Sequence, residues 1–129
     1  MLRGIMTKRA IIGVEHRGGI FAGLKKWART VDRGRPVAEA DYYLNFETAG
    51  VLFAELTPQR MKTLETLKQT GSQSIYALAK RLGRNYSNVH QDVSKLIEHG
   101  LVEKNKDGKV FVPWSAVEIH VTLGEEKVA

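Results

Sequence analysis

The chain has 129 residues, of which 43% are hydrophobic and 26% charged, and its formal net charge is +6. This length and composition are typical of one globular domain with a modest core, and they exclude a fibrous repeat and wholesale disorder. The absence of cysteine excludes disulfides and thiolate metal sites, and the four histidines show no metal-ligand spacing. No apolar run approaches the roughly 20 residues of a membrane span. We therefore expect a cytoplasmic protein without a metal or other cofactor.

The positive charge is unevenly distributed along the chain. Residues 1–35 hold nine Lys or Arg against two acidic residues, whereas residues 61–129 hold ten against eight. A basic balance suits the binding of a polyanion such as nucleic acid, but a solvated surface explains it as well. Charge alone therefore leaves both interpretations open.

The first third of the chain is expected to form a small strand-helix-strand lobe. Residues 10–14 and 41–46 have strand-like composition, and residues 20–31 between them carry one apolar helical stripe. A short connecting helix is predicted at about residues 48–56. Because so small a lobe cannot hold a core of its own, we expect it to pack on the rest of the chain or on a second subunit.

Three helices are predicted in the middle of the chain, at about residues 58–69, 75–82 and 86–99. Each begins after a side chain that can cap a helix, namely Thr57, Ser74 and Asn85. Gly83 ends the second helix, so only residues 83–85 separate it from the third. Two short helices joined by so tight a turn indicate a helix-turn-helix.

A β-hairpin is predicted directly after the third helix. Residues 101–103 and 109–112 are strand-like and flank Asp107-Gly108, a strong turn signal. Three lysines surround the turn and can contact phosphates, namely Lys104, Lys106 and Lys109. A basic hairpin in this position is the wing of a winged helix. Residues 117–123 alternate as a half-buried strand does.

The predicted fold class is α+β, a winged helix-turn-helix domain with a small N-terminal strand-helix-strand extension. The expected division has three parts. Residues 1–55 form a basic extension for dimerisation or partner binding, residues 56–123 form the winged helix-turn-helix, and residues 124–129 form a frayed tail.

The third helix has two distinct faces. Tyr86, Val89, Val93, Leu96 and Ile97 form its apolar face. On the opposite face, three small polar side chains are candidates for reading base edges, namely Ser87, Asn88 and Gln91. Four residues of the turn and helix are candidates for phosphate contact, namely Arg84, Tyr86, His90 and Lys95. Polar residues on the outer face do not by themselves indicate DNA binding, because any surface helix has them. The tight turn before the third helix and the basic hairpin after it favour DNA binding.

His90 and Asp92 do not form a catalytic dyad, because residues two apart on a helix point in different directions. A hydrogen bond to the neighbouring helix, or a phosphate contact from His90, suits them better. The sequence also offers no phosphate-cradling glycine loop, metal cluster or nucleophile with a base at useful spacing. We therefore expect no enzymatic activity.

The middle of the chain resembles winged helix-turn-helix transcription regulators of the MarR-like and ArsR-like type, and more closely a small prokaryotic family of predicted DNA-binding regulators. The resemblance covers roughly residues 42–123. It rests on the segments Leu56–Arg60, Ser74–Ala79, Leu82–Val93 and Gly100–Glu103. Where that family commonly has a basic residue this chain has Gln91, which favours a contact with adenine.

The resemblance implies a repressor that binds double-stranded DNA. We expect a homodimer on a palindromic operator, because one winged helix covers too few base pairs to be selective. Some members of the family resemble antitoxins that bind a partner toxin and their own promoter. The alternative is therefore an antitoxin, and binding of structured RNA through the same hairpin is a further possibility.

Overall fold

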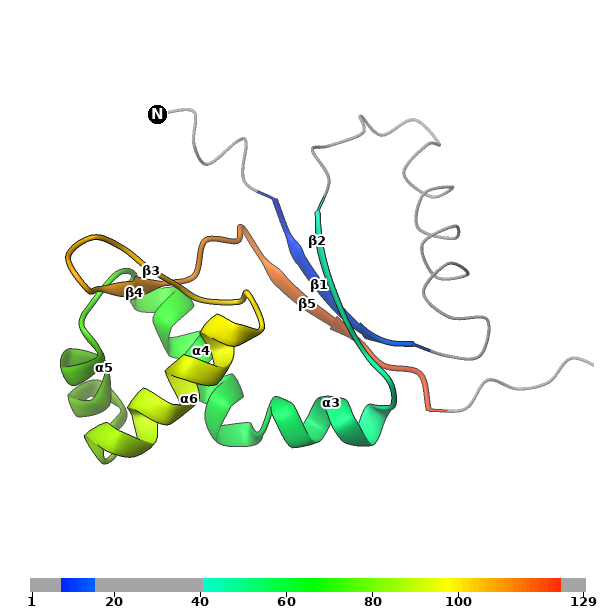
Figure 1. The fold of residues 1–129 in the computed structure, drawn as a ribbon, viewed down its shortest axis with the longest axis horizontal. Helices are drawn as coiled ribbons and strands as arrows, with labels where there is room; N and C mark the ends of the chain where they lie inside the picture. The colour runs from blue at the N-terminus through cyan, green and yellow to red at the C-terminus, as the bar shows by residue number, and fades with distance from the viewer. Residues whose placement is uncertain (1–7, 16–40, 124–129) are drawn as a thin grey trace, which may run out of the picture. The chain divides into compact units, whose positions relative to one another are not determined.

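The computed structural model describes residues 8–15 and 41–123. The helix expected at residues 20–31 and the tail 124–129 lie outside the described residues. Four helices and five strands are described, which confirms the α+β class (Figure 1). In chain order they are β1 (Ala10–Val14), β2 (Tyr42–Phe46), α3 (Ala49–Glu55), α4 (Pro58–Thr70), α5 (Ile75–Leu82), α6 (Tyr86–Glu98), β3 (Glu103–Lys104), β4 (Val110–Phe111) and β5 (Val117–His120).

Contacts divide the chain into two compact units. The first unit combines Met1–Ala54 with Trp114–Ala129, and the second is Glu55–Pro113. The second unit therefore contains the three helices and the hairpin that the sequence predicts, and the first contains the N-terminal strands together with β5. No helix among the described residues is long and apolar enough to cross a membrane.

The first unit is built on a three-stranded parallel sheet in the order β2-β1-β5. Ala10 of β1 lies opposite Tyr42 on one side and Val117 on the other. The Arg9 guanidinium holds the starts of the strands together, because it reaches Asp41 at 3.0 Å and Glu118 at 3.1 Å. Parallel pairing of three segments so far apart in sequence makes this unit dependent on both ends of the chain.

The role of β5 differs from the sequence-based expectation. Residues 117–123 were grouped with the winged-helix domain, and the N-terminal lobe was expected to lack a core. Instead, β5 pairs with β1 of the first unit, in which Ala10, Ile12, Phe46 and Leu52 are buried. The expectation about a separate core stays a prediction. Pairing between strands more than 100 residues apart leaves no local pattern, so only the strands themselves were predictable.

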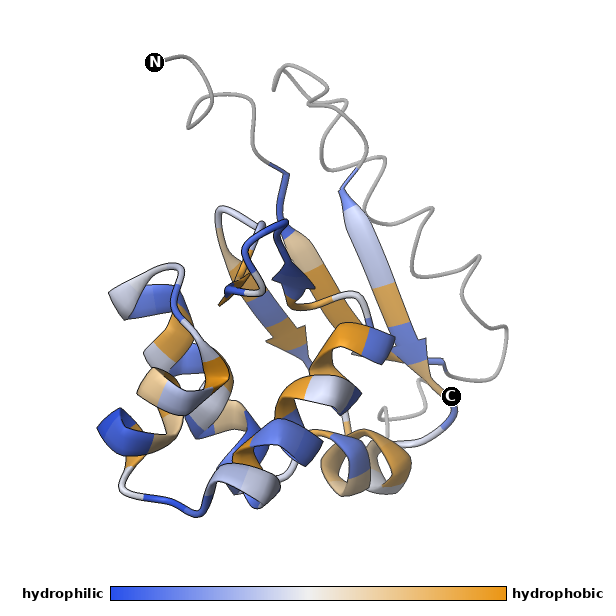
Figure 2. Cartoon of the chain, turned by 60° about the vertical axis from the view of Figure 1, so that its left-hand side comes forward, coloured by the Kyte–Doolittle hydropathy of each residue, from blue (hydrophilic) through white to orange (hydrophobic). Residues whose placement is uncertain are grey.

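The second unit packs α4, α5 and α6 around one apolar core. Its innermost side chains include Leu67, Leu78, Val93, Leu96 and Leu101, all at most 1% exposed. Each helix also carries hydrophilic positions, as the mixed colouring of the helices in Figure 2 shows. The predicted helices and their caps are confirmed: Thr57 accepts a hydrogen bond from the Arg60 amide at 3.2 Å, and Ser74 accepts one from the Ala77 amide at 3.0 Å.

The hairpin is attached to the helices through the segment between α4 and α5. Gln73 and Val110 exchange two backbone hydrogen bonds, at 2.8 and 3.1 Å, and form an isolated bridge beside the β3-β4 pair. Val110 is fully buried. This attachment fixes the base of the hairpin on the helical unit and leaves its loop to solvent.

Candidate nucleic-acid interface

A three-residue turn sets the direction of α6 relative to α5. Gly83 adopts the left-handed conformation, with φ 65°, which glycine tolerates because it has no Cβ. Asn85 then begins α6, since its side-chain oxygen accepts a hydrogen bond from the Ser87 amide at 2.8 Å. The turn predicted at residues 83–85 is therefore present.

Helix α6 buries one face and exposes the other. Val89, Val93 and Leu96 are fully buried, as predicted for the core face. The three residues proposed to read bases are all exposed, and together we call them the reading face: Ser87, Asn88 and Gln91. The 3.6-residue period of the helix separates these two sets, so the polar side chains stand outward while the apolar ones hold the helix in place.

Tyr86 does not belong to the core face, where the sequence analysis placed it. Its side chain is 49% exposed, and its ring lies 5.8 Å from the ring of His90, which is also exposed. Tyr86 is the first residue of α6, one turn before the apolar stripe meets the other helices at Val89. The two rings therefore lie together at the solvent-exposed edge of the apolar face.

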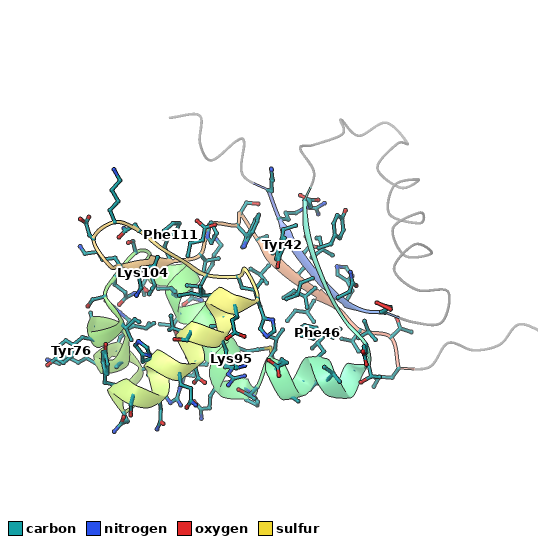
Figure 3. All side chains as sticks on the ribbon, in the orientation of Figure 1. Tyr42, Phe46, Tyr76, Lys95, Lys104 and Phe111 are labelled. Carbon is teal, nitrogen blue, oxygen red and sulfur yellow. The ribbon has the colours of Figure 1, made fainter. Side chains whose placement is uncertain are left out.

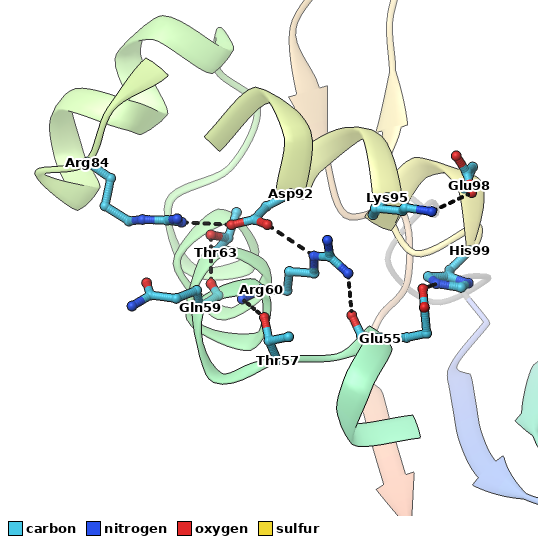
Figure 4. A network of polar contacts seen from close by, with 10 residues as sticks. All are labelled: Glu55, Thr57, Gln59, Arg60, Thr63, Arg84, Asp92, Lys95, Glu98 and His99. Carbon is cyan, nitrogen blue, oxygen red and sulfur yellow. Dashed lines mark hydrogen bonds and ion pairs between the residues drawn. The ribbon is translucent and has the colours of Figure 1, made fainter. Parts of the chain in front are cut away.

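Asp92 forms the centre of an ion-pair group, which we call the arginine-aspartate cluster: Arg60, Arg84 and Asp92 (Figure 4). Asp92 is buried, and its two carboxylate oxygens accept hydrogen bonds from Arg60 Nε at 3.0 Å and from Arg84 Nη1 at 2.8 Å. The predicted hydrogen bond from this part of α6 to the neighbouring helix is therefore confirmed for Asp92. Its burial was not foreseen, because the partner Arg60 lies 32 residues earlier in the chain.

The arginine-aspartate cluster changes the role available to Arg84. From the sequence, Arg84 is a candidate phosphate contact. In the structure its side chain is only 23% exposed, and its guanidinium is directed to Asp92. Arg60 also donates to the Glu55 carbonyl oxygen at 3.0 Å. The cluster thus fixes α6 and the preceding turn against the start of α4.

A hydrogen-bonded pair of side chains, His99 and Glu55, fixes the other end of α6. His99 Nε2 lies 2.9 Å from Glu55 Oε1. The hydrogen bond from His99 lowers the pKa of the Glu55 carboxyl below its ordinary value. Beyond His99, Gly100 has φ 79° and Leu101 is fully buried, as the predicted helix end requires. Helix α6 is therefore held at both ends.

Lys95 lies further along α6 and is half-buried (Figure 3). Its ammonium group is 3.5 Å from the Glu98 carboxylate, an exposed pair one turn apart. Such pairs are weak and exchange readily with solvent. The structure therefore leaves Lys95 accessible as a candidate phosphate contact.

The hairpin loop is ordered by one side chain, Asn105. Its oxygen accepts hydrogen bonds from the backbone amides of Asp107 at 2.9 Å and Lys109 at 3.0 Å. Gly108 has φ 78°, in agreement with the predicted turn. All three lysines of the loop are exposed, and we call them the hairpin lysines: Lys104, Lys106 and Lys109. The shape of the loop thus comes from the backbone and Asn105, which leaves the lysines available to a ligand.

Helix α5 adds a surface that the sequence analysis did not assign. Tyr76 is 62% exposed and projects away from α5 (Figure 3), and Lys80 Nζ lies 5.6 Å from the centre of its ring. The spacing of four residues on one helix brings the two side chains together. The sequence does contain a signal for this surface, because Tyr76 is a large aromatic residue outside the apolar stripe of α5. Together with α6 and the hairpin lysines, this surface offers hydrogen-bonding groups and cations to a polyanion.

The model of the HVO_A0114 family matches residues 55–119. No curated protein matches the chain. Among solved structures, the multiple antibiotic-resistance repressor (MarR) from Listeria monocytogenes is similar at 21% sequence identity with a TM-score of 0.42. The match covers 71% of this chain and 61% of that protein, so the chain spans less than two thirds of its length. Because the family model covers half of the sequence, the chain belongs to the HVO_A0114 family.

Proposed function

We propose that the chain is a sequence-specific regulator of transcription that binds double-stranded DNA. In this proposal residues 55–113 act as a winged helix-turn-helix, with α6 in the major groove. One observation carries it: the reading face of α6 is polar and exposed, whereas Val89, Val93 and Leu96 on the opposite side are fully buried. A major groove admits one α-helix, and such a face can approach base edges closely.

The proposed contacts fall into two classes. Asn88 and Gln91 can each bond adenine through two hydrogen bonds, and Ser87 can pair with several base edges. Phosphate contacts position the protein and carry no base information. We assign these to the hairpin lysines and, around α6, to Tyr86, His90 and Lys95. The exposed pair of Tyr76 and Lys80 adds a backbone contact from α5.

We propose further that the regulator acts as a homodimeric repressor on a palindromic site. Two half-sites one helical turn apart supply the selectivity that a single module lacks. The first unit exposes large apolar side chains that suit a partner, since Val51 is 41%, Phe53 47% and Ile119 39% exposed. Light scattering on the full chain measures this directly, and a monomeric mass would remove the dimer from the proposal.

The same apolar side chains favour a second candidate, an antitoxin whose first unit binds a different protein. In that case DNA binding serves autoregulation. Purification of the untagged chain from its own host separates the two candidates, because a second protein in equal amount supports the antitoxin and a single species of twice the chain mass supports the homodimer.

Selection from genomic DNA tests the proposed function. The full chain is incubated with sheared genomic fragments at physiological salt, and the retained fragments are sequenced. We expect a shared short sequence with two-fold symmetry, located upstream of genes. Structured RNA from the same host serves as competitor. Retention without any shared sequence, or loss of the DNA to equimolar RNA, would contradict the proposal.

A further inference from the structure

We propose that α6 prefers A·T base pairs at the centre of each half-site, because its reading face carries two side-chain amides and the helix contains no arginine. This inference rests on the proposed function and deepens it, since it names the class of DNA sequence that the same surface recognises. Two observations support it: the carboxamides on the reading face, and the binding of the nearby arginines to Asp92.

The reading face carries two carboxamides at a spacing that suits neighbouring base pairs. Asn88 and Gln91 are exposed and three residues apart, so they lie on one side of the helix, separated by about 4.5 Å along its axis. Neighbouring bases are about 3.4 Å apart along the duplex. A carboxamide matches adenine, which presents one acceptor and one donor in the major groove. Two adjacent A·T pairs are therefore within reach of the two amides.

Guanine presents two acceptors in the major groove, and arginine or lysine is the side chain that most commonly bonds both. Helix α6 contains no arginine, and its one lysine, Lys95, lies one turn beyond Gln91 and pairs with Glu98 at 3.5 Å. The guanidiniums of Arg60 and Arg84 both bind Asp92 of α6, at 3.0 and 2.8 Å, and their side chains are 16% and 23% exposed. The arginine-aspartate cluster thus keeps these two guanidiniums occupied.

A randomised duplex library tests the base preference. Full-length protein selects from 20-base-pair random duplexes with fixed ends, and the selected pool is sequenced. We expect A·T pairs to be enriched at the two adjacent central positions of each half-site. Replacing either of them by G·C in the selected duplex should weaken binding on the order of tenfold.

Gln91→Arg is the matched gain-of-function variant. Because Gln91 is exposed, the substitution spares the core, and the new guanidinium should convert one enriched position from A·T to G·C. Gln69→Arg is the control, since it makes the same chemical change on the exposed side of α4. The control should leave the selected sequence unchanged.

The outcomes separate the inference from the proposed function. Enrichment of A·T pairs that shifts to G·C only with Gln91→Arg supports the inference. Enrichment of a G·C centre by the wild-type chain, or an unchanged sequence with Gln91→Arg, overturns it while sequence-specific binding stands. A selected pool without any enriched sequence overturns the proposed function itself.

Discussion

Removal of the Asp92 carboxylate should destabilise the second unit strongly. Among the residues that the structure describes, Asp92 is the one carboxylate that forms an ion pair with Arg60 and with Arg84. In Asp92→Ala the guanidiniums of Arg60 and Arg84 therefore face the place of the missing carboxylate and have no counter-charge there. The variant also removes the link that ties α6 to α4, so the loss should appear as a change in global unfolding.

The expected loss in the free energy of unfolding depends on how exposed the three side chains are. Breaking a fully buried ion pair by removing one partner costs about 3 to 5 kcal/mol. The Asp92, Arg60 and Arg84 side chains are 12%, 16% and 23% exposed, so water compensates part of the loss. We expect the free energy of unfolding to fall by about 2 to 3 kcal/mol.

Urea denaturation followed by circular dichroism measures the loss, with Glu98→Ala as the control. Glu98 pairs with Lys95 at 3.5 Å, and its side chain is 67% exposed, so this variant should lose less than about 0.5 kcal/mol. A loss below about 1 kcal/mol for Asp92→Ala would refute the reasoning, because the two arginines would then be satisfied by water.

Three further predictions address other parts of the second unit. Replacing Lys106 and Lys109 together by Ala should weaken specific and nonspecific DNA complexes alike and flatten the plot of log affinity against log salt by about one to two units per protomer; an unchanged slope in a salt series means that these lysines face solvent. Val93→Asp should unfold the second unit, because Val93 is fully buried and the new carboxylate has no partner, and a cooperative thermal transition near that of the wild type would contradict this. Glu55→Gln should reduce the loss of stability in acid. The hydrogen bond from His99 lowers the folded-state pKa of Glu55 below its ordinary 4.5, so the pair contributes stability above that pH and loses it as the pH falls through the lowered pKa. Urea midpoints measured from about pH 6 to about pH 3 test this, and equal acid sensitivity of variant and wild type would contradict it.

The local elements of the second unit were predictable from sequence because each has a short-range signal. Thr57, Ser74 and Asn85 cap their helices as their side chains indicate, and Gly83 and Gly108 occupy the left-handed conformations that end a helix and form a turn. The exposed reading face followed from the helical period alone.

Contacts between distant residues were not predictable in the same way. Asp92 looked like a surface acid beside the reading face, and its burial depends on Arg60, 32 residues earlier. The pairing of β5 with β1 joins the two ends of the chain and has no local pattern. Tyr86 was placed in the core because its apolar ring fits the period, although the first residue of a helix has no packed turn before it.

The central claim is that the reading face of α6 recognises DNA sequence. The most direct measurement is the affinity of Asn88→Ala and Gln91→Ala for a duplex selected by the wild type and for its scrambled counterpart, at one fixed salt concentration. We predict that each variant loses about 1 to 3 kcal/mol on the selected duplex, keeps its affinity for the scrambled one, and shows an unchanged melting temperature. Undiminished affinity of both folded variants for the selected duplex would contradict the claim.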